Sequence, residues 1–456
     1  MQRLTSIYIG LLLTVFLFAF GPGGYVTIGQ VKYQLFLLIC GGYVISSILL
    51  RTQMALTGTQ PIGNFRQKLK GLSMPEKLLF AFLFFTIISA LLSDFDGVFR
   101  GEFRQEGVLT ITIYVLCTLF LSRYFRPQKW MLYLFGSSVT FVSVLAFVQL
   151  TGANPFGLYP AGLNYYDSGT HYVGEFLSTL GNAGLFGGFL SLAVGVLAMA
   201  IIKLETNSRW LLAIPLFTAV LLIFSMGINA AVLAVLVGFV IMLPVAMRTR
   251  EGLDKKGLMN TLAVFGICLL TFLLSRVLTF YDGGVLLGFV THEAQNGMFW
   301  EAAQILQGNI DDTFGTRRIF IWRNVIENLH WGILLFGTGP DTLGFWPIPP
   351  FTRYIPEIGV MNVTIIDAAH NEYLHILATN GLLALLSYLG ALVYSAVKWL
   401  RFPDNPIAAM MGAGVLLYCI QAFFGISQCI VAPFFWACFA MLINAQNKNL
   451  SNSQVV

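Results

Sequence analysis

Charged side chains are scarce in this sequence, at 10% of its 456 residues, whereas 57% of the residues are hydrophobic. A soluble domain carries about 25% charged residues, because its surface has to be hydrated. No soluble fold has enough interior to bury so many apolar side chains. At roughly 20 residues per bilayer-spanning helix, the hydrophobic residues would fill on the order of 13 spans. The composition therefore predicts an all-α, polytopic integral membrane protein.

Several signatures of other protein classes are missing. The six cysteines lie in apolar runs without a CxxC pair, which is typical of small core residues rather than of disulfides or a metal site. The net charge of +5 is too dilute to form a groove that follows a phosphate backbone, so we expect no nucleic-acid partner. No HExxH, Walker A, GxSxG or kinase pattern occurs either. The sequence thus gives no sign of the common soluble enzyme classes.

Apolar runs separated by polar breaks predict about twelve transmembrane helices in a single membrane domain, residues 1–456. The first run follows one cation and lacks a convincing cleavage site, so we interpret it as a retained span rather than a signal peptide. Because twelve is an even number, both termini are expected on the same side. The runs lie near 4–20, 33–50, 78–93, 108–122, 131–150, 181–202, 210–226, 230–247, 258–280, 370–396, 407–427 and 430–445.

The distribution of charge predicts the orientation of these spans. The segments on the side of residues 51–77 hold 18 of the cations and five of the acids, a net charge of +13. The opposite side holds eight cations and 16 acids, a net charge of −8. Lysine and arginine accumulate on the cytoplasmic side of membrane proteins. We therefore expect both termini in the cytoplasm and the acidic side in the periplasm or outside the cell.

Arginine dominates the few cations of the outer side. A planar guanidinium is preferred where phosphate or carboxylate has to be gripped in a partly dry site. The alternative interpretation is that these arginines form structural salt bridges with the outer acids. The outer cations are Arg100, Arg104, Arg276, Arg317, Arg318, Arg323, Arg353 and Lys32.

One outer loop is exceptionally long, at 89 residues between the ninth and tenth spans, 281–369. A loop of this length inside a compact domain is usually functional. Its aromatic content and its periodicity predict short amphipathic helices near 293–307 and 316–329. The apolar face of the second would consist of Ile319, Trp322, Val325, Ile326 and Leu329. We expect these helices at the outer membrane interface.

The strongest candidate for chemistry follows this loop, in the stretch DAAHNEYLHILATNG, residues 367–381. Asp367 is a plausible N-cap of the tenth span, which would put His370 and Asn371 in its first turn. A helix N-terminus disfavours imidazolium, so His370 would stay neutral and able to accept a proton. The free amides of the same turn suit an anionic group. The alternative is a lone interfacial histidine that bonds a loop carbonyl, but the arginine-rich loop beside it favours a site.

Two further patterns carry less chemical meaning. Asp94 and Asp96 form an Asp-x-Asp pair, which can hold a metal in nucleotide-sugar transferases. Nucleotide sugars are cytoplasmic and this pair faces out, so we interpret it as a capped, solvated loop and expect no metal. The run Gly337-Thr338-Gly339-Pro340 lacks the strand and the third glycine of a dinucleotide fingerprint, and it favours a tight turn against a membrane surface.

Taken in order, these segments resemble the bacterial O-antigen ligase and O-antigen polymerase superfamily. The resemblance lies in the block from Thr316 to Phe345 and in His370-Asn371 followed by Gly381, with support from GEFRQEGVLT (101–110) and STLGNAGLFGGFLSLA (178–193). The chain departs from the family pattern at Ala384. It also departs at Asn229, where many relatives carry an arginine, and we expect Arg104 or Arg353 to take over that phosphate contact.

The resemblance implies a glycosyltransferase whose donor is a glycan linked to undecaprenyl diphosphate, with no metal or cofactor. Arg318, with Arg317 or Arg323, would then stabilise the diphosphate leaving group. His370 would take the proton of the acceptor hydroxyl, and Asn371 would orient His370 or the sugar.

The same resemblance sets the expected partners and location. The acceptor would be a lipid A core, another glycan or another hydroxyl compound, and membrane lipid would deliver the donor. The protein would lie in the bacterial plasma membrane, with its active site on the periplasmic or extracellular face.

The alternative is a twelve-helix transporter or flippase for a lipid-linked or anionic substrate. Transporters place ionisable residues near the bilayer midplane, often in two related halves. Here no internal repeat is visible, and the ionisable residues collect toward one side. That pattern favours chemistry at a membrane surface.

Overall fold

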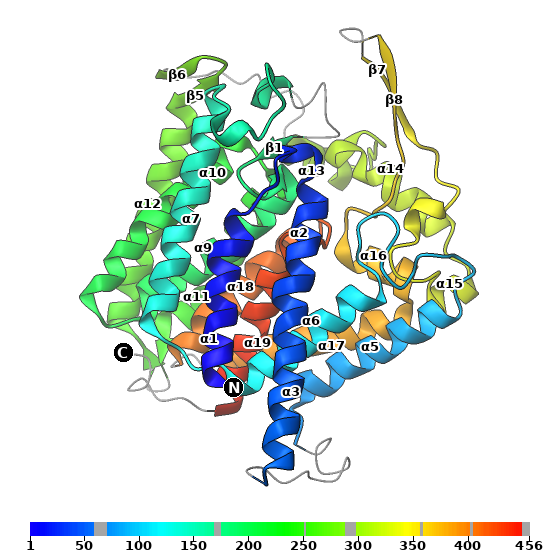
Figure 1. The fold of residues 1–456 in the computed structure, drawn as a ribbon. Helices are drawn as coiled ribbons and strands as arrows, with labels where there is room; N and C mark the ends of the chain where they lie inside the picture. Colours follow the sequence, from blue (N-terminus) through cyan, green and yellow to red (C-terminus); the bar gives the residue numbers. More distant parts are fainter. Residues whose placement is uncertain are drawn as a thin grey trace.

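The computed structural model describes residues 1–58, 71–167, 175–249, 252–287, 298–355, 359–401 and 405–448, and these are mostly helical (Figure 1). The helices are α1 (Gln2–Leu11), α2 (Ile28–Phe36), α3 (Gly42–Leu56), α5 (Met74–Leu91), α6 (Val108–Tyr124), α7 (Lys129–Leu150), α9 (Ala183–Lys203), α10 (Ala213–Met226), α11 (Asn229–Met247), α12 (Lys255–Val277), α13 (Met298–Leu306), α14 (Phe314–Glu327), α15 (Trp331–Phe336), α16 (Glu372–Asn380), α17 (Leu382–Arg401), α18 (Pro406–Ala422) and α19 (Ala432–Lys448).

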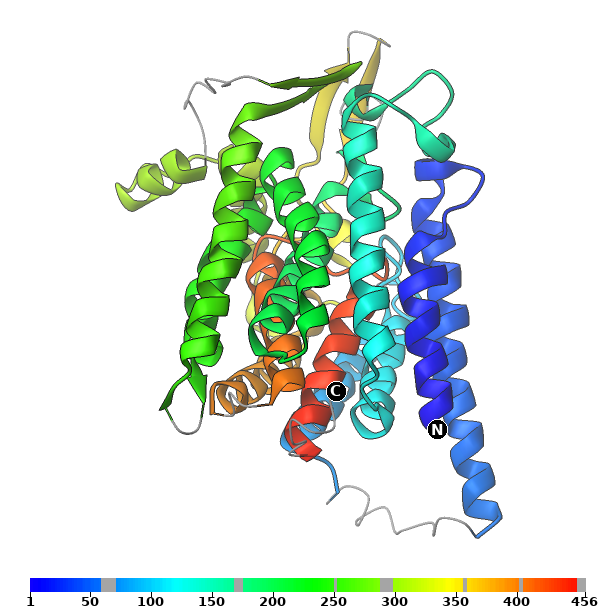
Figure 2. The same cartoon turned by 90° about the vertical axis from the view of Figure 1, so that its left-hand side faces the viewer.

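The described strands form four small antiparallel hairpins. Two of them, β5–β6 and β7–β8, lie at the end of the molecule opposite to the end of α3 (Figure 2). The pairs are β1 (Phe176–Leu177) with β2 (Gly181–Asn182), β3 (Arg248–Thr249) with β4 (Gly252–Leu253), β5 (Leu278–Tyr281) with β6 (Gly284–Leu287), and β7 (Phe351–Ile355) with β8 (Val360–Thr364).

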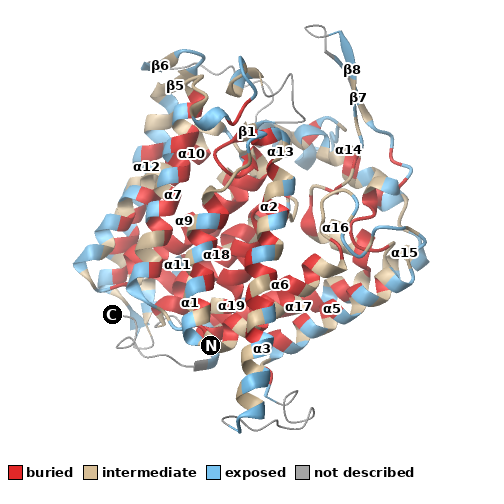
Figure 3. Cartoon of the chain, viewed as in Figure 1, coloured by how far each residue is buried: buried red, intermediate tan, exposed pale blue. Residues whose placement is uncertain are grey.

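The long helices confirm an all-α polytopic membrane protein. Among the described residues, eight helices are long and apolar enough to cross a membrane, and three more are apolar but shorter. The longest, Ile28–Leu56, joins α2 and α3 through one wide turn at Leu37–Gly41. Helix α9 lies at the centre and packs along α18. Every residue of its most apolar 18-residue stretch is buried (Figure 3). A helix that is apolar all round has to be surrounded in this way.

The tenth apolar run is not one helix but two. Helix α16 ends at Asn380, Gly381 has a φ of +86°, and α17 begins at Leu382. The prediction that Asp367 caps this helix is wrong. The N-cap is Asn371, whose Oδ1 accepts a hydrogen bond from the Leu374 amide at 3.0 Å. The Asp367 carboxylate is bound by an arginine instead, so His370 lies before the helix and not in its first turn.

The turn at Gly337–Pro340 caps the break between α16 and α17. The Thr338 amide donates to the Ala378 carbonyl at 3.2 Å, and the Gly339 amide donates to the Thr379 carbonyl at 2.8 Å. The Ser89 hydroxyl of α5 also donates to the Thr379 carbonyl, at 2.8 Å. Away from water, unpaired backbone groups cost several kcal/mol each. This turn was expected to lie against the membrane surface; it lies against the end of a helix.

The described part of the long loop, 281–369, contains both expected helices, as α13 and α14, together with α15 and the β7–β8 hairpin, which was not expected. The apolar face predicted for α14 is partly wrong, because Ile326 is 58% exposed whereas Ile321 is buried. Ile321 and Val325 pack with Leu343 in a small core that the loop forms for itself. The face of α14 is therefore set by protein contacts, which the helical period alone did not identify.

We predict that Gly381→Ala destabilises the protein strongly. A Cβ at this position would lie 2.4 Å from the Leu335 carbonyl oxygen, a backbone atom that cannot rotate away, and its positive φ alone costs about 1–3 kcal/mol. Thermal unfolding in detergent measures the effect. The matched control is Gly308→Ala, which has a similar φ of +85° and no heavy atom within 4 Å of the added Cβ. Equal losses in both variants would contradict a role of the close approach.

Candidate functional site

His370 lies in the segment between β8 and α16, in a left-handed backbone conformation with a φ of +48°. Such a conformation is costly for a residue other than glycine, and it is found mostly at functional sites. Burial lowers the pKa of His370, and the charges of Arg104 and Arg318 lower it by more than Asp367 raises it. The resulting pKa is about 3. His370 is therefore neutral at physiological pH, as expected from the sequence. The cause is burial between two arginines and not the helix N-terminus.

Arg104 is connected to the segment before α16 by an ion pair. One of its terminal nitrogens lies 2.5 Å from Asp367 Oδ1, and both side chains are largely shielded from solvent. Arg104 belongs to the loop between α5 and α6, more than 260 positions earlier in the chain. This contact explains why Asp367 does not cap α16, and it brings the loop from α5 to α6 beside His370.

Arg318 reaches the site from α14. Its Nε donates to the Phe424 carbonyl at 3.0 Å, and a terminal nitrogen donates to the Gly315 carbonyl at 2.7 Å. One helical turn later, the Trp322 indole donates to the Ala369 carbonyl at 2.9 Å, which holds α14 against the residue before His370. Burial lowers the pKa of Arg318, although nearby Glu301 opposes this. Among the described residues, no carboxylate forms an ion pair with Arg318.

Arg317 and Arg323, two of the other arginines expected at the site, make their contacts elsewhere. The Arg317 guanidinium lies 4.8 Å from the centre of the Phe351 ring, and Arg323 forms an exposed ion pair with Asp312 at 2.9 Å. Arg353 lies in β7 opposite Asn362, and its side chain is outside the described part of the structure. Diphosphate contacts by these three residues stay predictions.

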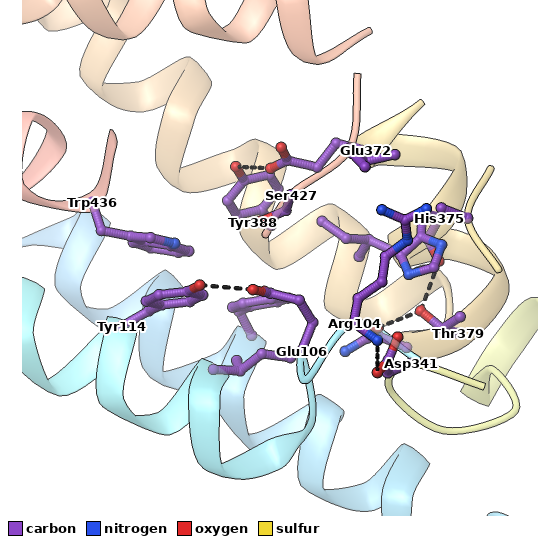
Figure 4. Close-up of a pocket in the computed structure, with 16 residues that line it drawn as sticks. Arg104, Glu106, Tyr114, Asp341, Glu372, His375, Thr379, Tyr388, Ser427 and Trp436 are labelled. Carbon is purple, nitrogen blue, oxygen red and sulfur yellow. Dashed lines mark hydrogen bonds between the residues drawn. The ribbon is translucent and has the colours of Figure 1, made fainter. Parts of the chain in front are cut away.

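A small cavity of about 50 Å³ adjoins this site and is rich in ionisable side chains (Figure 4). Its wall comes from α5, α6, α16, α17 and α19, from the loops before α6 and between α18 and α19, and from the segments after the capping turn and before α16. Sequence analysis missed its three carboxyl residues. They could have been found as acids within or next to apolar runs, which are rare in membrane proteins and usually functional. The ionisable residues lining the cavity are Arg104, Glu106, Tyr114, Asp341, Glu372, His375 and Tyr388.

Two of these carboxyl groups are bound by tyrosine hydroxyls. The Tyr114 hydroxyl donates to Glu106 at 2.8 Å, and the Tyr388 hydroxyl donates to Glu372 at 2.7 Å. Burial raises the pKa of Glu106 to about 8 and that of Glu372 to about 7, although the tyrosines lower both values. At neutral pH, a substantial fraction of each side chain is therefore protonated and uncharged.

The third carboxyl group connects two loops. Asp341 follows the turn that caps α16, and its Oδ2 accepts hydrogen bonds from the Phe103 amide at 3.0 Å and the Arg104 amide at 2.8 Å. Burial raises the pKa of Asp341 to about 6, while these two amides and the Arg104 charge lower it. Asp341 thus fixes the backbone at Arg104 and stays mainly ionised at neutral pH.

The side chain of Asn371 is partly occupied by its role as N-cap. Its Oδ1 accepts the hydrogen bond of the cap, so any orienting role toward His370 or a sugar falls to the side-chain NH2 group. Within the described residues, no group of three or more His, Cys, Asp or Glu is arranged to hold a metal ion.

Comparison with known proteins gives one result on family. Residues 214–389 match the family model described as O-antigen ligase. The match covers α14, the capping turn, His370 and α16, whereas Arg104 and Glu106 lie outside it. No curated protein matches the chain.

We predict that Glu106→Gln flattens the pH dependence of stability. The folded-state pKa of about 8 lies above the ordinary 4.5, so folding binds a proton. The stabilising contribution is complete below the ordinary pKa and is lost as pH rises through about 8. The unfolding temperature of the wild type in detergent should therefore fall between pH 5 and pH 9, and that of Glu106→Gln should fall less. The exposed Glu327 supplies the control, since Glu327→Gln should keep the wild-type slope.

Proposed function

We propose that this chain, whose residues 214–389 match the O-antigen ligase family model, transfers a glycan from a lipid diphosphate donor to an acceptor hydroxyl at a membrane surface. The product would be a cell-surface polysaccharide or glycoconjugate. The resemblance favours undecaprenyl diphosphate as the donor lipid. It leaves lipid A core, another glycan and other hydroxyl compounds open as acceptors.

The observation that carries this proposal is the pairing of Arg318 with His370. Arg318 is a half-buried cation that donates to two backbone carbonyls and forms no ion pair among the described residues, although Glu301 acts on it electrostatically. Its charge also acts on the neutral His370. A cation that is partly shielded from water and has no ion pair is costly, and an anionic ligand would relieve that cost. The leaving group of a lipid-linked donor is a diphosphate, which is such an anion.

The chemistry follows from these two groups. As the acceptor oxygen bonds to the anomeric carbon, the bond from that carbon to the diphosphate oxygen breaks, and its electron pair leaves with the diphosphate. Arg318, with help from the charge of Arg104, which also acts on His370, stabilises the developing negative charge. His370 takes the proton from the acceptor hydroxyl.

Donor binding would also activate the base. Arg104 and Arg318 lower the pKa of His370, and a bound diphosphate would cancel much of their positive charge. The proton affinity of His370 would then rise when the substrate is in place. This coupling favours proton transfer only in the loaded enzyme.

The topology that we propose has twelve membrane crossings with both termini in the cytoplasm of a bacterium. The site then lies toward the outer face, beside the part of the molecule that carries β5–β8. A polyprenyl chain would reach the site from the surrounding bilayer. The segregation of lysine and arginine to the opposite side supports this orientation.

A transporter or flippase is the second candidate, and one observation favours it. The interrupted helix α16–α17 resembles the discontinuous helices that bind substrates in transporters. The two functions are separable in detergent, where there is no membrane to cross. Consumption of a lipid-linked donor by the purified protein would support transfer, and donor that stays intact would favour transport.

We predict that His370→Ala and Arg318→Lys both lose glycan transfer. Loss of a general base costs about 10²–10⁴-fold in rate, and lysine keeps the charge of Arg318 but not its planar fork. The assay follows product from a lipid-linked oligosaccharide and a hydroxyl acceptor, with the unfolding temperature checked for each variant.

The matched control is Arg126→Lys, since Arg126 is exposed and is not among the residues expected to bind the donor. It should keep close to wild-type activity. Full activity in His370→Ala would rule out His370 as the base. Full activity in Arg318→Lys would rule out that the planar guanidinium of Arg318 is needed to bind the diphosphate.

A further inference from the structure

The cavity beside the site contains a buried carboxylate oxygen that the proposed chemistry does not use. Asp341 is only 2% exposed, and while its Oδ2 accepts two backbone amides, its Oδ1 has no hydrogen-bond partner among the described residues. Arg104 Nε and His375 Nδ1 are likewise buried without a described partner. All three residues line the same cavity.

These three atoms suit water or another small hydroxyl species. Asp341 Oδ1 is an acceptor, Arg104 Nε is a donor, and His375 Nδ1 can be either, according to its tautomer. A cavity of about 50 Å³ holds roughly three to five water molecules. Ser427 and the tyrosine-bound carboxyls Glu106 and Glu372 complete its polar wall. The number of polar partners matches what a short chain of waters needs.

The cavity also reaches the segment that carries His370. Ala368, two residues before His370, lines it, and so does His375, which lies within electrostatic range of His370. Arg104 lines the cavity and binds Asp367 of the same segment. The segment that carries His370 therefore borders the polar cavity that Asp341 also lines.

We propose that water in this cavity carries the acceptor proton from His370 to Asp341, which holds it until it leaves for bulk solvent. The inference rests on the proposed transfer reaction. In the step, the acceptor O–H bond breaks and its proton moves to His370. The imidazolium then passes the proton through water to Asp341 Oδ1. His370 returns to its neutral form and the carboxylate becomes a carboxylic acid.

The acid–base properties of the groups favour Asp341 over its neighbours. His370, with a pKa of about 3, holds a proton less well than Asp341, with a pKa of about 6. Glu106 and Glu372 already carry protons in part, and tyrosine hydroxyls occupy them. The charged and titratable groups that face the cavity or His370 are Arg104, Glu106, Tyr114, Arg318, Asp341, Asp367, Glu372, His375, Tyr388 and Tyr418.

The first test is Asp341→Asn. The amide oxygen of asparagine can still accept the Phe103 and Arg104 amides, but asparagine cannot take a proton. We expect the variant to fold and to bind donor, with a transfer rate lower by about 10²-fold, the low end for a lost proton-transfer group. The wild-type rate should fall as pH drops through about 6, and Asp341→Asn should lose this dependence. Asp312→Asn, in the ion pair with Arg323, is the matched control and should keep the wild-type profile.

The second test does not need activity. Infrared spectra of the full chain in detergent, made with isotope-labelled aspartate, follow the carbonyl band of protonated aspartic acid as pH is changed. We expect a labelled band that titrates near pH 6 in the wild type and is missing in Asp341→Asn. Its absence from the wild type overturns the inference, even if the variant fails to fold.

The outcomes separate the two proposals. An active wild type with an unchanged rate and pH profile in Asp341→Asn overturns the proton path and leaves the transfer reaction standing. A wild type that transfers no glycan from any lipid-linked donor overturns the proposed function and the proton path with it. If Asp341→Asn loses both the fall in rate at low pH and the infrared band near pH 6, the result supports the transfer reaction and the proton path.

Discussion

The interruption of the helix at Gly381 is the constraint on which the site depends. A helix that stops inside an apolar bundle exposes carbonyl groups that must find donors. The turn at Gly337–Pro340 provides them, and the backbones at Gly337 and Gly381 approach so closely that a Cβ on either would meet a carbonyl oxygen. Asp341 follows directly and holds the backbone at Arg104. One capping requirement thus fixes α16, the capping turn and the loop before α6, and Arg104 of that loop binds Asp367 in the segment that carries His370.

The pKa values in the site follow from this geometry, because a basic histidine and acidic carboxyl groups are buried near one another. His370 lies among cations that disfavour its charge, while Glu106 and Asp341 lie in a cavity that disfavours theirs. Burial alone therefore moves the proton affinity of the base and of the carboxyls in opposite directions. Such separated pKa values are typical of sites that move protons.

The sequence predicted the elements of this protein better than their contacts. Apolar runs of the right length identify helices because hydrophobicity is a local property, and the tenth run failed only where Gly381 breaks it. His370 and Arg318 were found because histidine and arginine are conspicuous in so apolar a chain. Glu106 was missed although it lies next to an apolar run, whereas the role of Asp341 comes from its contact with the amides of residues 103–104, which no local pattern encodes. Asp367 was assigned to a cap for the same reason, since Arg104 lies more than 260 positions away.

The abundance of arginine on the expected outer side has several physical causes, and separating them isolates one residue. Arg100, Arg276 and Arg317 lie over aromatic rings, and Arg104 and Arg323 pair with carboxylates. Lys32, the exception, is fully buried and donates to the Phe16 and Leu17 carbonyls at 2.6 and 2.9 Å, a helix-capping task for which a compact ammonium is well suited. Among the outer arginines whose side chains the structure describes, Arg318 alone has neither an aromatic nor a carboxylate partner. An arginine is most informative about a ligand when the protein provides no ion pair for it, and by that criterion the ligand of this site is an anion next to Arg318.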